Sequence, residues 1–304
     1  MNSSQRGVAI VMAMSVVALA AVATTAMMTT QSTWTRESEL EVDHAQAQIL
    51  IQAGVDWGRA VLGDDRRLSN VDHLKEPWAL RLPPMPVDNG ELAGYIEDQQ
   101  GAFNLNNLVR GGKISVVQLE RFRKLLKTLD LPTALAQSLA DWIDADNDLQ
   151  PNGGAEDNYY LSLEAPYLTA NRPLTDVSEL ALVRGYNDQV RERLGPFVSA
   201  LPENTAVNVN TASPEVLSAV IEGLDLDAAR ALVAQRDRTY FRDMSDFSSR
   251  LPRGIEIASN DLRVSSSYFV ARVRVTIGPA EARGMALLVR SDIGWPTIVW
   301  RKYQ

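Results

Sequence analysis

The stretch "RGVAIVMAMSVVALAAVATTAMM", from Arg6 to Met28, decides the architecture of this 304-residue chain. From Val8 to Met28 every residue is apolar or small and polar, and the first charge after Arg6 is Arg36. About 20 such residues in a helix cross the roughly 30 Å hydrocarbon core of a bilayer. The segment therefore predicts a transmembrane helix close to the N-terminus.

A cleaved signal peptide is the main alternative, with Ala20–Ala23 as a small-residue cleavage site. The sequence after the apolar segment argues against it, because apolar residues go on recurring three or four positions apart. These residues are Val42, Ala45, Ile49, Ala53, Trp57 and Ala60. No proline interrupts the chain from Val8 to Leu62. We therefore expect one helix over residues 8–62, with residues 8–28 in the membrane.

Charges on either side of this segment indicate its orientation. Arg6 precedes the segment, whereas four acidic residues follow it, namely Glu37, Glu39, Glu41 and Asp43. Basic residues concentrate on the cytoplasmic side of a membrane helix. The N-terminus of this single-pass chain is therefore expected in the cytoplasm, and the remainder is expected to be exported.

A short leader that ends in Gly7, followed by this helix, resembles the type IV pilin and pseudopilin class. The resemblance implies that prepilin peptidase removes residues 1–7, that Val8 becomes the N-terminus, and that the apolar helix assembles into a filament. An anchor that is never processed remains the alternative.

Met12 stands at the fifth position after the expected cleavage, where most members of that class carry a glutamate. In the class, this glutamate pairs with the N-terminal ammonium of a neighbouring subunit. A carboxylate in lipid is costly unless it is paired, so a subunit without such a neighbour is more stable without it. Among pseudopilins, the K-type minor pseudopilin of type II secretion, which sits at the filament tip, lacks this glutamate. In this respect the chain resembles the K type.

The sequence predicts an α+β fold, with the long N-terminal helix packed on a small antiparallel sheet. "LPPMPVDNG" (residues 82–90) reads as a loop, and alternating or short apolar runs predict the strands. The predicted strands cover residues 91–98, 268–277, 284–291 and 297–303. Together they predict a pilin-like domain formed by residues 63–103 and 263–304.

Residues 104–262 have helical spacing and read as an inserted all-α domain, which is a peculiarity of the K-type pseudopilins. The predicted helices cover residues 114–129, 133–143, 176–186, 213–223 and 227–237. Ser213 with Pro214 predicts a helix cap, and Asp176 with Glu179 has capping-box spacing. "AFNLNNLV" (102–109) and "AVNVNTAS" (206–213) repeat an Asn-X-Asn pattern. Because there are only two copies, the repeat is attributed to chance or to a shared geometry at the start of a helix.

Residues 207–247 resemble the helix-hairpin-helix modules of DNA-uptake and repair proteins. Their hairpin, residues 222–227, holds one glycine and three acids, which disfavour phosphate. The net charge of −8 also disfavours nucleic acid. Arg230, Arg236 and Arg238 are interpreted as a solvated helix face. A membrane-anchored DNA-binding protein is kept as the alternative function.

"DWIDADNDLQPNGGAEDNYY" (residues 141–160) is the strongest chemical signal in the chain. No lysine or arginine lies between Lys127 and Arg172, so the clustered carboxylates need water, protons or a cation. Oxygen ligands without cysteine or histidine favour calcium. An EF-hand that began at Asp144 would need glycine at Leu149 and glutamate at Ala155, so the loop is of another kind.

The K-type resemblance also implies calcium in the helical domain. We expect the calcium to be structural, so that its binding energy contributes to folding. Asp141 is assigned to the helix face rather than to the ion. The predicted ligands are Asp144, Asp146, Asp148, Glu156 and Asp157, with Gln150 through its backbone carbonyl.

Catalysis has no support in the sequence. The chain has no cysteine and only two histidines, His44 and His73, neither with a partner set for metal or triad chemistry. Phosphate loops, nucleophile elbows and dinucleotide-binding glycine patterns are absent. The resemblance instead implies a minor pseudopilin that joins the I, J and then H types through its helix and globular domain, and that faces the outer-membrane secretin or secreted substrates.

Overall fold

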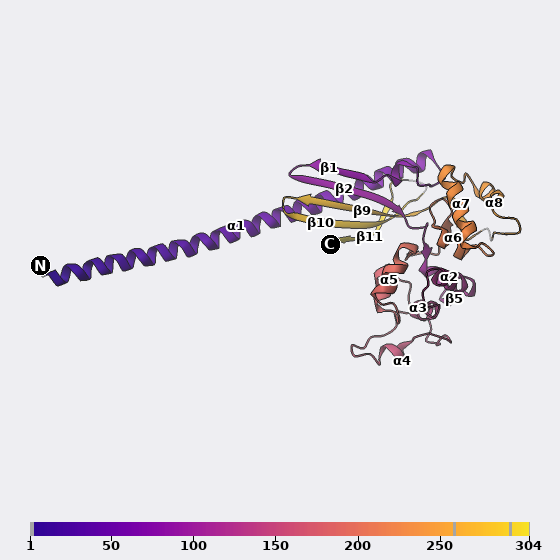
Figure 1. Ribbon diagram of the computed structural model, residues 1–304, viewed down its shortest axis with the longest axis horizontal. Coiled ribbons are helices and arrows are strands. Elements are labelled where there is room, and N and C mark those ends of the chain that lie inside the picture. The colour runs from indigo at the N-terminus through magenta and orange to yellow at the C-terminus, as the bar shows by residue number, and fades with distance from the viewer. Residues whose placement is uncertain (1–2, 258–259, 292–293, 304) are drawn as a thin grey trace.

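The computed structural model describes residues 3–257, 260–291 and 294–303, with side chains from residue 10 onward except Ser32. A single helix, α1 (Ser3–Leu68), projects away from the rest of the molecule over its first half and packs on a sheet over its second half (Figure 1). The inserted helices lie at the end of the sheet that is far from the N-terminus (Figure 1).

Helix α1 ends at Leu68, six residues beyond the expected end at Leu62. Its last turns contain no proline, and the pair between Arg67 and Asp64, at 3.1 Å, supports them. Within the apolar half, hydroxyl groups donate back to the preceding turn, as Thr24 does to the carbonyl of Ala20 at 2.7 Å. Among the described residues, α1 is the one helix long and apolar enough to cross a bilayer.

Five antiparallel strands form the sheet, in the order β1-β2-β9-β10-β11. The strands are β1 (Leu82–Val87), β2 (Gly90–Asp98), β9 (Tyr268–Ile277), β10 (Ala280–Val289) and β11 (Thr297–Tyr303). The sheet and the helix beside it confirm the α+β fold that the sequence predicts. All strands of this sheet lie outside the inserted segment.

Strand β1 lies where the sequence predicts a loop, so that prediction is wrong. Pro83, Pro84 and Pro86 lack the N–H group of a central strand, but β1 is at the edge of the sheet and pairs only with β2. Asn89, with φ of 61°, forms the tight turn into β2. The three prolines, which suggested a loop, therefore belong to an edge strand whose outer side has few N–H groups for pairing with another strand.

The inner face of the sheet packs against one stripe of α1, which includes Ala47, Ile51 and Val55. Alternate residues of β9, such as Val273 and Val275, lie opposite this stripe, as the alternation predicts. Gly284 on β10 allows the close approach, because a Cβ atom there would lie 2.2 Å from Cγ2 of Ile51. This interface is the core of the pilin-like domain.

The insertion is helical and has its own core, which is larger than that of the sheet domain. Its predicted segment 176–186 forms only a 3-10 helix, Val177–Leu182, because Gly185, with φ of 87°, follows closely. Helices α4, α5 and α8 were not predicted. The α-helices are α2 (Val116–Thr128), α3 (Leu135–Ile143), α4 (Asp157–Tyr160), α5 (Asp188–Leu194), α6 (Pro214–Val220), α7 (Leu226–Arg238) and α8 (Met244–Ser249).

The Asn-X-Asn repeat has a structural counterpart. Asn106 bonds with its amide to both the N–H and the carbonyl of Leu174, and Asn210 does the same to Phe241. Each copy also begins in a short parallel pair: β3 (Phe103–Asn104) with β6 (Val198–Ser199), and β7 (Val207–Asn208) with β8 (Leu262–Arg263). The insertion is therefore built from two related modules, and chance does not explain the repeat.

A buried ionic network joins these parts. Arg290, just after β10, donates to Asp65 on α1 at 2.8 Å and to Asp72 in the following loop at 2.6 Å. Asp72 also accepts from the N–H of Ser266, and Asn208 of the insertion donates to the carbonyl of Asp72 and to Asp98 at the end of β2. Burial raises the pKa of Asp65 to about 6, with the charge of Glu76 adding to the effect, although Arg290 opposes it.

Substituting Arg290→Met should lower the free energy of unfolding by about 3–5 kcal/mol, because Asp65 and Asp72 would stay buried without their cation. Urea unfolding of a fragment without the apolar segment, residues 36–304, measures the change. Arg283→Met is the matched control, since Arg283 pairs with Glu281 at the surface of the same strand, and it should cost less than about 1 kcal/mol. Equal losses in the two variants would contradict the role of the network.

Candidate functional site

Three buried carboxylates meet at the end of α3. Asp141 and Asp144 come from its last turn and from the residue after it, and Glu156 immediately precedes α4. One oxygen of each lies within 4.8 Å of the others. Their exposed fractions are 0%, 2% and 5%, so water does not separate the charges. The sequence around α3 and α4 thus creates an acidic cluster inside the insertion.

Each member of this cluster has an oxygen with no hydrogen-bond partner among the described residues: Oδ1 of Asp141, Oδ1 of Asp144 and Oε1 of Glu156. Burial raises the pKa of Asp141 to about 6. Burial, with neighbouring carboxylates adding to it, raises the pKa of Asp144 and of Glu156 to about 7. A buried oxygen without a donor is costly, so the cluster needs protons or a cation.

A second group of buried carboxylates, Asp65, Asp72 and Glu76, is equally close but has the guanidinium of Arg290. No ion pair within the described ranges reaches the acidic cluster. Arg184 comes near, but it donates to the carbonyl of Gly154 at 3.0 Å and lies 4.6 Å from the ring of Tyr159. The acidic cluster is therefore the group whose geometry calls for a metal ion.

The predicted ligands divide into two sets. Asp144 and Glu156 belong to the cluster. Asp146 and Asp148 are exposed, yet their charges help to raise the pKa of Asp144, so they lie close by. Asp157 also lies beside the cluster, because the hydroxyl of Thr169 donates to both Glu156 and Asp157 and the charge of Asp157 helps to raise the pKa of Glu156.

Gln150, the remaining predicted ligand, uses its backbone locally. Its carbonyl accepts from the N–H of Gly154 at 3.2 Å, and its own N–H donates to Oδ2 of Asp141, also at 3.2 Å. A carbonyl oxygen has two lone pairs, so the contact with Gly154 leaves room for a metal ion. The complete ligand set stays a prediction.

Sequence reasoning assigned Asp141 to the helix face and so missed it as a cluster member. The signal was present in the spacing, because residues three positions apart on a helix lie on the same face. Asp141 and Asp144 have this spacing at the end of α3. The chain turns back at Asn152 and Gly153, both with positive φ, and this turn places Glu156 beside the face that Asp141 and Asp144 share.

Aromatic rings pack against one another beside the loop that joins α3 to α4. Trp142 packs edge-on against Tyr160 at 5.0 Å between ring centroids, and Tyr167 adjoins both. These rings hold α3 and α4 together, which fixes Asp141, Asp144 and Glu156 near one another. Hard oxygen donors in a partly flexible loop fit Ca²⁺ better than metals that prefer nitrogen or sulfur.

The helix-hairpin-helix segment has no surface for phosphate. Lys124 of α2 donates to the carbonyls of Ile221 and Leu224 and so covers the hairpin, while Asp225 caps α7. Arg236 is buried and donates to carbonyls of the second module, so its interpretation as part of a solvated face is wrong. The DNA-binding alternative has no support in this geometry.

Neither histidine forms a catalytic arrangement with its described neighbours. His44 is exposed on α1. His73 stacks on Tyr240 at 3.9 Å between ring centroids, and its Nδ1 accepts from the N–H of Lys75. Burial lowers the pKa of His73. Its contacts join the loop after α1 to the insertion, which is a structural role.

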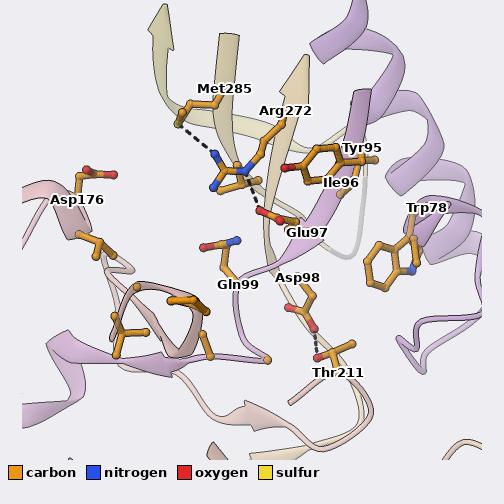
Figure 2. A pocket seen from close by; sticks show the side chains of 18 of the residues that line it. Trp78, Tyr95, Ile96, Glu97, Asp98, Gln99, Asp176, Thr211, Arg272 and Met285 are labelled. Carbon is orange, nitrogen blue, oxygen red and sulfur yellow. Dashed lines mark hydrogen bonds and ion pairs between the residues drawn. The ribbon is translucent and has the colours of Figure 1, made fainter. Parts of the chain in front are cut away.

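A cleft of about 900 Å³ separates the outer face of the sheet from the insertion (Figure 2). Two ion pairs lie along it: Arg272 with Glu97 at 2.7 Å, and Lys302 with Asp176 at 2.6 Å. The second pair connects β11 to the insertion. These contacts hold the two parts in one orientation.

The periodic apolar residues of α1 form a surface of their own. Val42, Ile49 and Trp57 are 54%, 69% and 47% exposed, on the side of α1 away from the stripe that covers the sheet. We call the surface formed by Val42, Ala45, Ile49, Ala53, Trp57 and Ala60 the apolar stripe. Exposed apolar surface of this extent marks a contact with protein or membrane.

The processing residues fall at the start of α1. Gly7 and Val8 belong to the helix, and their side chains lie outside the described part of the structure. Met12 lies on the exposed surface of the apolar half, 65% exposed. No carboxylate therefore stands at this position of the membrane segment.

Comparison with known proteins agrees with these features. Two family models, each described as type II secretion system protein K, match residues 101–203 and 207–265, which are the two modules of the insertion. Protein K of Pseudomonas aeruginosa is 40% identical over 97% of this chain and 91% of its own length. Protein K of Klebsiella pneumoniae is 33% identical over 100% of this chain and 98% of its own length.

A solved structure has the same fold. A chain of the GspK-GspI-GspJ complex from the type 2 secretion system of enterotoxigenic Escherichia coli superposes with a TM-score of 0.78. It is 27% identical, and the match covers 88% of this chain and 99% of that one. The long helix, the small sheet, the helical insertion and these matches lead to one conclusion: this chain belongs to the type II secretion system protein K family, the K-type minor pseudopilins.

Proposed function

We propose that this chain is the tip subunit of a type II secretion pseudopilus. It is anchored in the inner membrane by α1, with its N-terminus in the cytoplasm and its globular part in the periplasm. The observation that carries the proposal is the apolar stripe, which continues the membrane helix outward and has no partner within the described chain. A long helix with an exposed apolar stripe is suited to packing against the N-terminal helices of other pseudopilins.

The position of the insertion supports a place at the tip. It lies at the end of the sheet opposite the N-terminus, where a further subunit would have to stack (Figure 1). Met12 supports the same place, because a subunit without the carboxylate needs no ammonium partner in lipid. Prepilin peptidase would first remove residues 1–7 and leave Val8 as the N-terminus.

The partners proposed are the I-type and J-type minor pseudopilins, followed by the H type. The solved relative is part of a complex named for GspK, GspI and GspJ. The exposed stripe supplies a surface for such partners in this chain. The insertion at the far end would face the outer-membrane secretin and the secreted substrates. The role is structural rather than enzymatic.

A charge within the stripe should prevent assembly without unfolding the chain. Ile49→Glu places a carboxylate on a surface that is 69% exposed in the single chain and buried in the proposed complex. We expect co-purification with the I-type and J-type pseudopilins to fall at least about tenfold. Gln48→Glu, at an exposed position about 100° around α1 from Ile49, adds the same charge and should leave assembly unchanged. Full assembly of Ile49→Glu would refute the proposal.

The acidic cluster is proposed as a structural calcium site. Asp141, Asp144 and Glu156 would hold the ion together with members of the predicted set, Asp146, Asp148, Asp157 and the Gln150 carbonyl. The unpartnered carboxylate oxygens support the proposal, because an ion would satisfy them together. When bound, calcium would neutralise the cluster and tie α3 to α4. The periplasmic location would expose the site to extracellular-type calcium.

Calcium should raise the melting temperature of the fragment of residues 36–304, and a chelator should lower it. At a calcium concentration of about 100 times Kd, stabilisation is about 2.7 kcal/mol, which is about 5–10 °C for a protein of this size. Glu156→Gln should abolish this shift. Glu164→Gln removes an exposed charge of the same loop region and serves as the control. A melting temperature that is indifferent to calcium and chelator would reject the site.

The calcium effect should depend on pH. Because the pKa values of Asp144 and Glu156 are raised to about 7, the metal-free folded state binds more protons than the unfolded chain between about pH 4 and 7. Stability from these groups is therefore complete below about pH 4 and is lost as pH rises through about 7. In chelator, the melting temperature should fall from pH 5.5 to 8, and calcium should reverse this fall.

The melting temperature is measured against pH once in chelator and once in calcium. The difference between the two curves reports on the acidic cluster alone, because other buried acids such as Asp65 titrate under both conditions. Scanning calorimetry with and without calcium at several pH values gives this difference. Two curves that stay parallel from pH 5.5 to 8 would show that the cluster does not bind the ion.

A further inference from the structure

The outer face of the sheet, which points away from α1, is organised in rows that run across the strands. Every second residue of a strand points outward, and the register places these residues side by side. One row beside the insertion is apolar on β9, β10 and β11, where it consists of Val270, Leu287 and Trp300. Val270 and Trp300 line the cleft between the sheet and the insertion, so the floor of the cleft is apolar here.

The next two rows along the strands are basic. Arg272 lies beside Met285 in the first of them and pairs with Glu97 at 2.7 Å (Figure 2). In the second, Arg274 and Arg283 lie directly opposite each other on β9 and β10. Like charges in this position destabilise a sheet. The pair is therefore a cost to the isolated chain, and a bound anion would remove that cost.

Two arginines of this face have no acidic partner within the described ranges. Arg274 is exposed, and its guanidinium forms no ion pair or hydrogen bond with any residue that the structure describes. Arg81, which precedes β1, lies over the ring of Tyr95 at 4.4 Å and has no carboxylate either. Arg283, in contrast, pairs with Glu281 at 2.7 Å. The face thus offers unneutralised guanidinium groups to an added anion.

A trough of about 490 Å³ runs along these basic rows. We call it the basic trough, and its cationic side chains are Arg81, Arg272, Arg274 and Arg283. It continues into the cleft of about 900 Å³, because Tyr95 and Met285 line both. Both volumes lie in the range of ligand sites. Together they form one path that leads from an apolar floor beside the insertion to an exposed basic surface.

The spacing of the rows matches an extended polypeptide. Neighbouring rows are two residues apart on each strand, which is about 6.7 Å. Side chains on one side of an extended segment have the same spacing. A segment that lies along the strands would place an apolar side chain in the cleft and then one carboxylate over each basic row. Arginine binds carboxylates through paired hydrogen bonds, so the face selects the pattern apolar-X-acid-X-acid.

The cleft also offers hydrogen bonds to a peptide backbone. Gln99 follows β2, and its side chain projects into the cleft (Figure 2). Among the described residues, none bonds to its side-chain amide. One amide can donate to a carbonyl and accept from an N–H group of a passing segment.

Anionic lipid is not the ligand. A Cβ atom on Gly54 of α1 would meet Val273 at 2.8 Å, so Gly54 lies at the level of the basic trough. It follows Met28 by 26 residues in one unbroken helix. At about 1.5 Å per residue, the trough stands about 40 Å beyond the end of the apolar segment.

Nucleic acid is disfavoured by the acids on the same face. Glu97 and Glu281 stand among the arginines, and Glu91 lies beside Thr276 in the following row. A continuous phosphate backbone would meet these acids as well as the arginines. Carboxylates at separate positions avoid them.

The position of the face indicates which protein supplies the segment. In the proposed pseudopilus the other subunits pack along α1, on the opposite side of the sheet, so they do not reach the outer face. The cleft lies between two parts of the molecule, so a projecting segment can enter it and the wall of a channel cannot. A secreted substrate is the protein outside the filament that can bring such a segment.

We propose that the outer face binds an extended segment of a secreted substrate, with an apolar side chain in the cleft and two carboxylates in the basic trough. This inference rests on the proposed role at the pseudopilus tip, and it names the chemistry by which the tip recognises a substrate. The carboxylates neutralise the opposed pair Arg274 and Arg283.

A labelled peptide tests the pattern. The probe is acetyl-Gly-Leu-Ser-Glu-Ser-Glu-Gly-amide, and fluorescence anisotropy measures its binding to the full chain in detergent micelles. Replacing both glutamates by glutamine should weaken binding at least about tenfold. The peptide acetyl-Gly-Leu-Glu-Glu-Ser-Ser-Gly-amide has the same composition but turns its two carboxylates to opposite sides, and it should also bind at least about tenfold more weakly. Equal binding of the three peptides would overturn the inference, as would tighter binding of inorganic polyphosphate than of the probe.

Variants of the chain locate the contact. Arg274→Gln combined with Arg283→Gln should weaken binding of the probe at least about tenfold. Arg301→Gln removes the same kind of charge from the inner side of β11, opposite Ala286, and should bind the probe normally. Arg274 and Arg301 are both exposed, so the melting temperatures should stay within a few degrees of the parent and show that the fold is intact. Unchanged binding by the double variant would place the peptide elsewhere and overturn the inference.

Secretion in cells separates this inference from the assembly role. The double variant should co-purify normally with the I-type and J-type pseudopilins but should release at least about fivefold less substrate into the medium. Normal secretion would overturn the substrate as the occupant and leave the assembly role standing. Loss of co-purification would make the outer face an assembly surface and would also overturn the inference. Failure of the assembly role itself is recognised separately, by full assembly of Ile49→Glu.

Discussion

The buried guanidinium of Arg290 makes the contact on which the arrangement of the whole globular part depends. It binds Asp65 at the end of α1 and Asp72 in the next loop, and both carboxylates are nearly inaccessible. Asn208 extends the network into the insertion. A buried ion pair contributes little net stability, but it is strongly directional. Its effect here is to fix the angle at which a helical insertion meets a pilin-like rod.

The protein neutralises two similar groups of buried carboxylates in different ways. At the junction, Arg290 supplies the positive charge from within the chain. In the first module of the insertion, no side chain of the described residues does so, and the carboxylates retain unpartnered oxygens. The first contact forms whenever the chain folds, whereas the second would depend, at the proposed calcium site, on an ion from the surroundings. The junction can therefore be rigid in any medium, while the order of the first module would follow the calcium concentration around it.

Local patterns in the sequence predicted the parts of the fold that depend on local physics. The apolar run gave α1, and alternation gave β9, because burial on one face requires that period. The sequence could not place β1, since its prolines suit a loop or a sheet edge equally, and only its pairing with β2 separates the two. Asp141 was missed for a similar reason: its membership in the acidic cluster depends on Glu156, which a turn brings back from 15 positions away.

The apolar periodicity of α1 shows how a correct pattern can leave its meaning open. Residues such as Ile49 and Trp57 repeat with helical spacing, but the sheet packs on a different stripe that includes Ala47, Ile51 and Val55. A helix with a single apolar face would bury it within its own domain. A helix that keeps a second apolar face, which begins at Val42 about 20 Å beyond the end of the apolar segment, leaves that face for a neighbour to cover. The fold itself therefore requires a neighbour along α1, while the insertion blocks the far end, and together these constraints describe a subunit that assembles sideways and ends a filament.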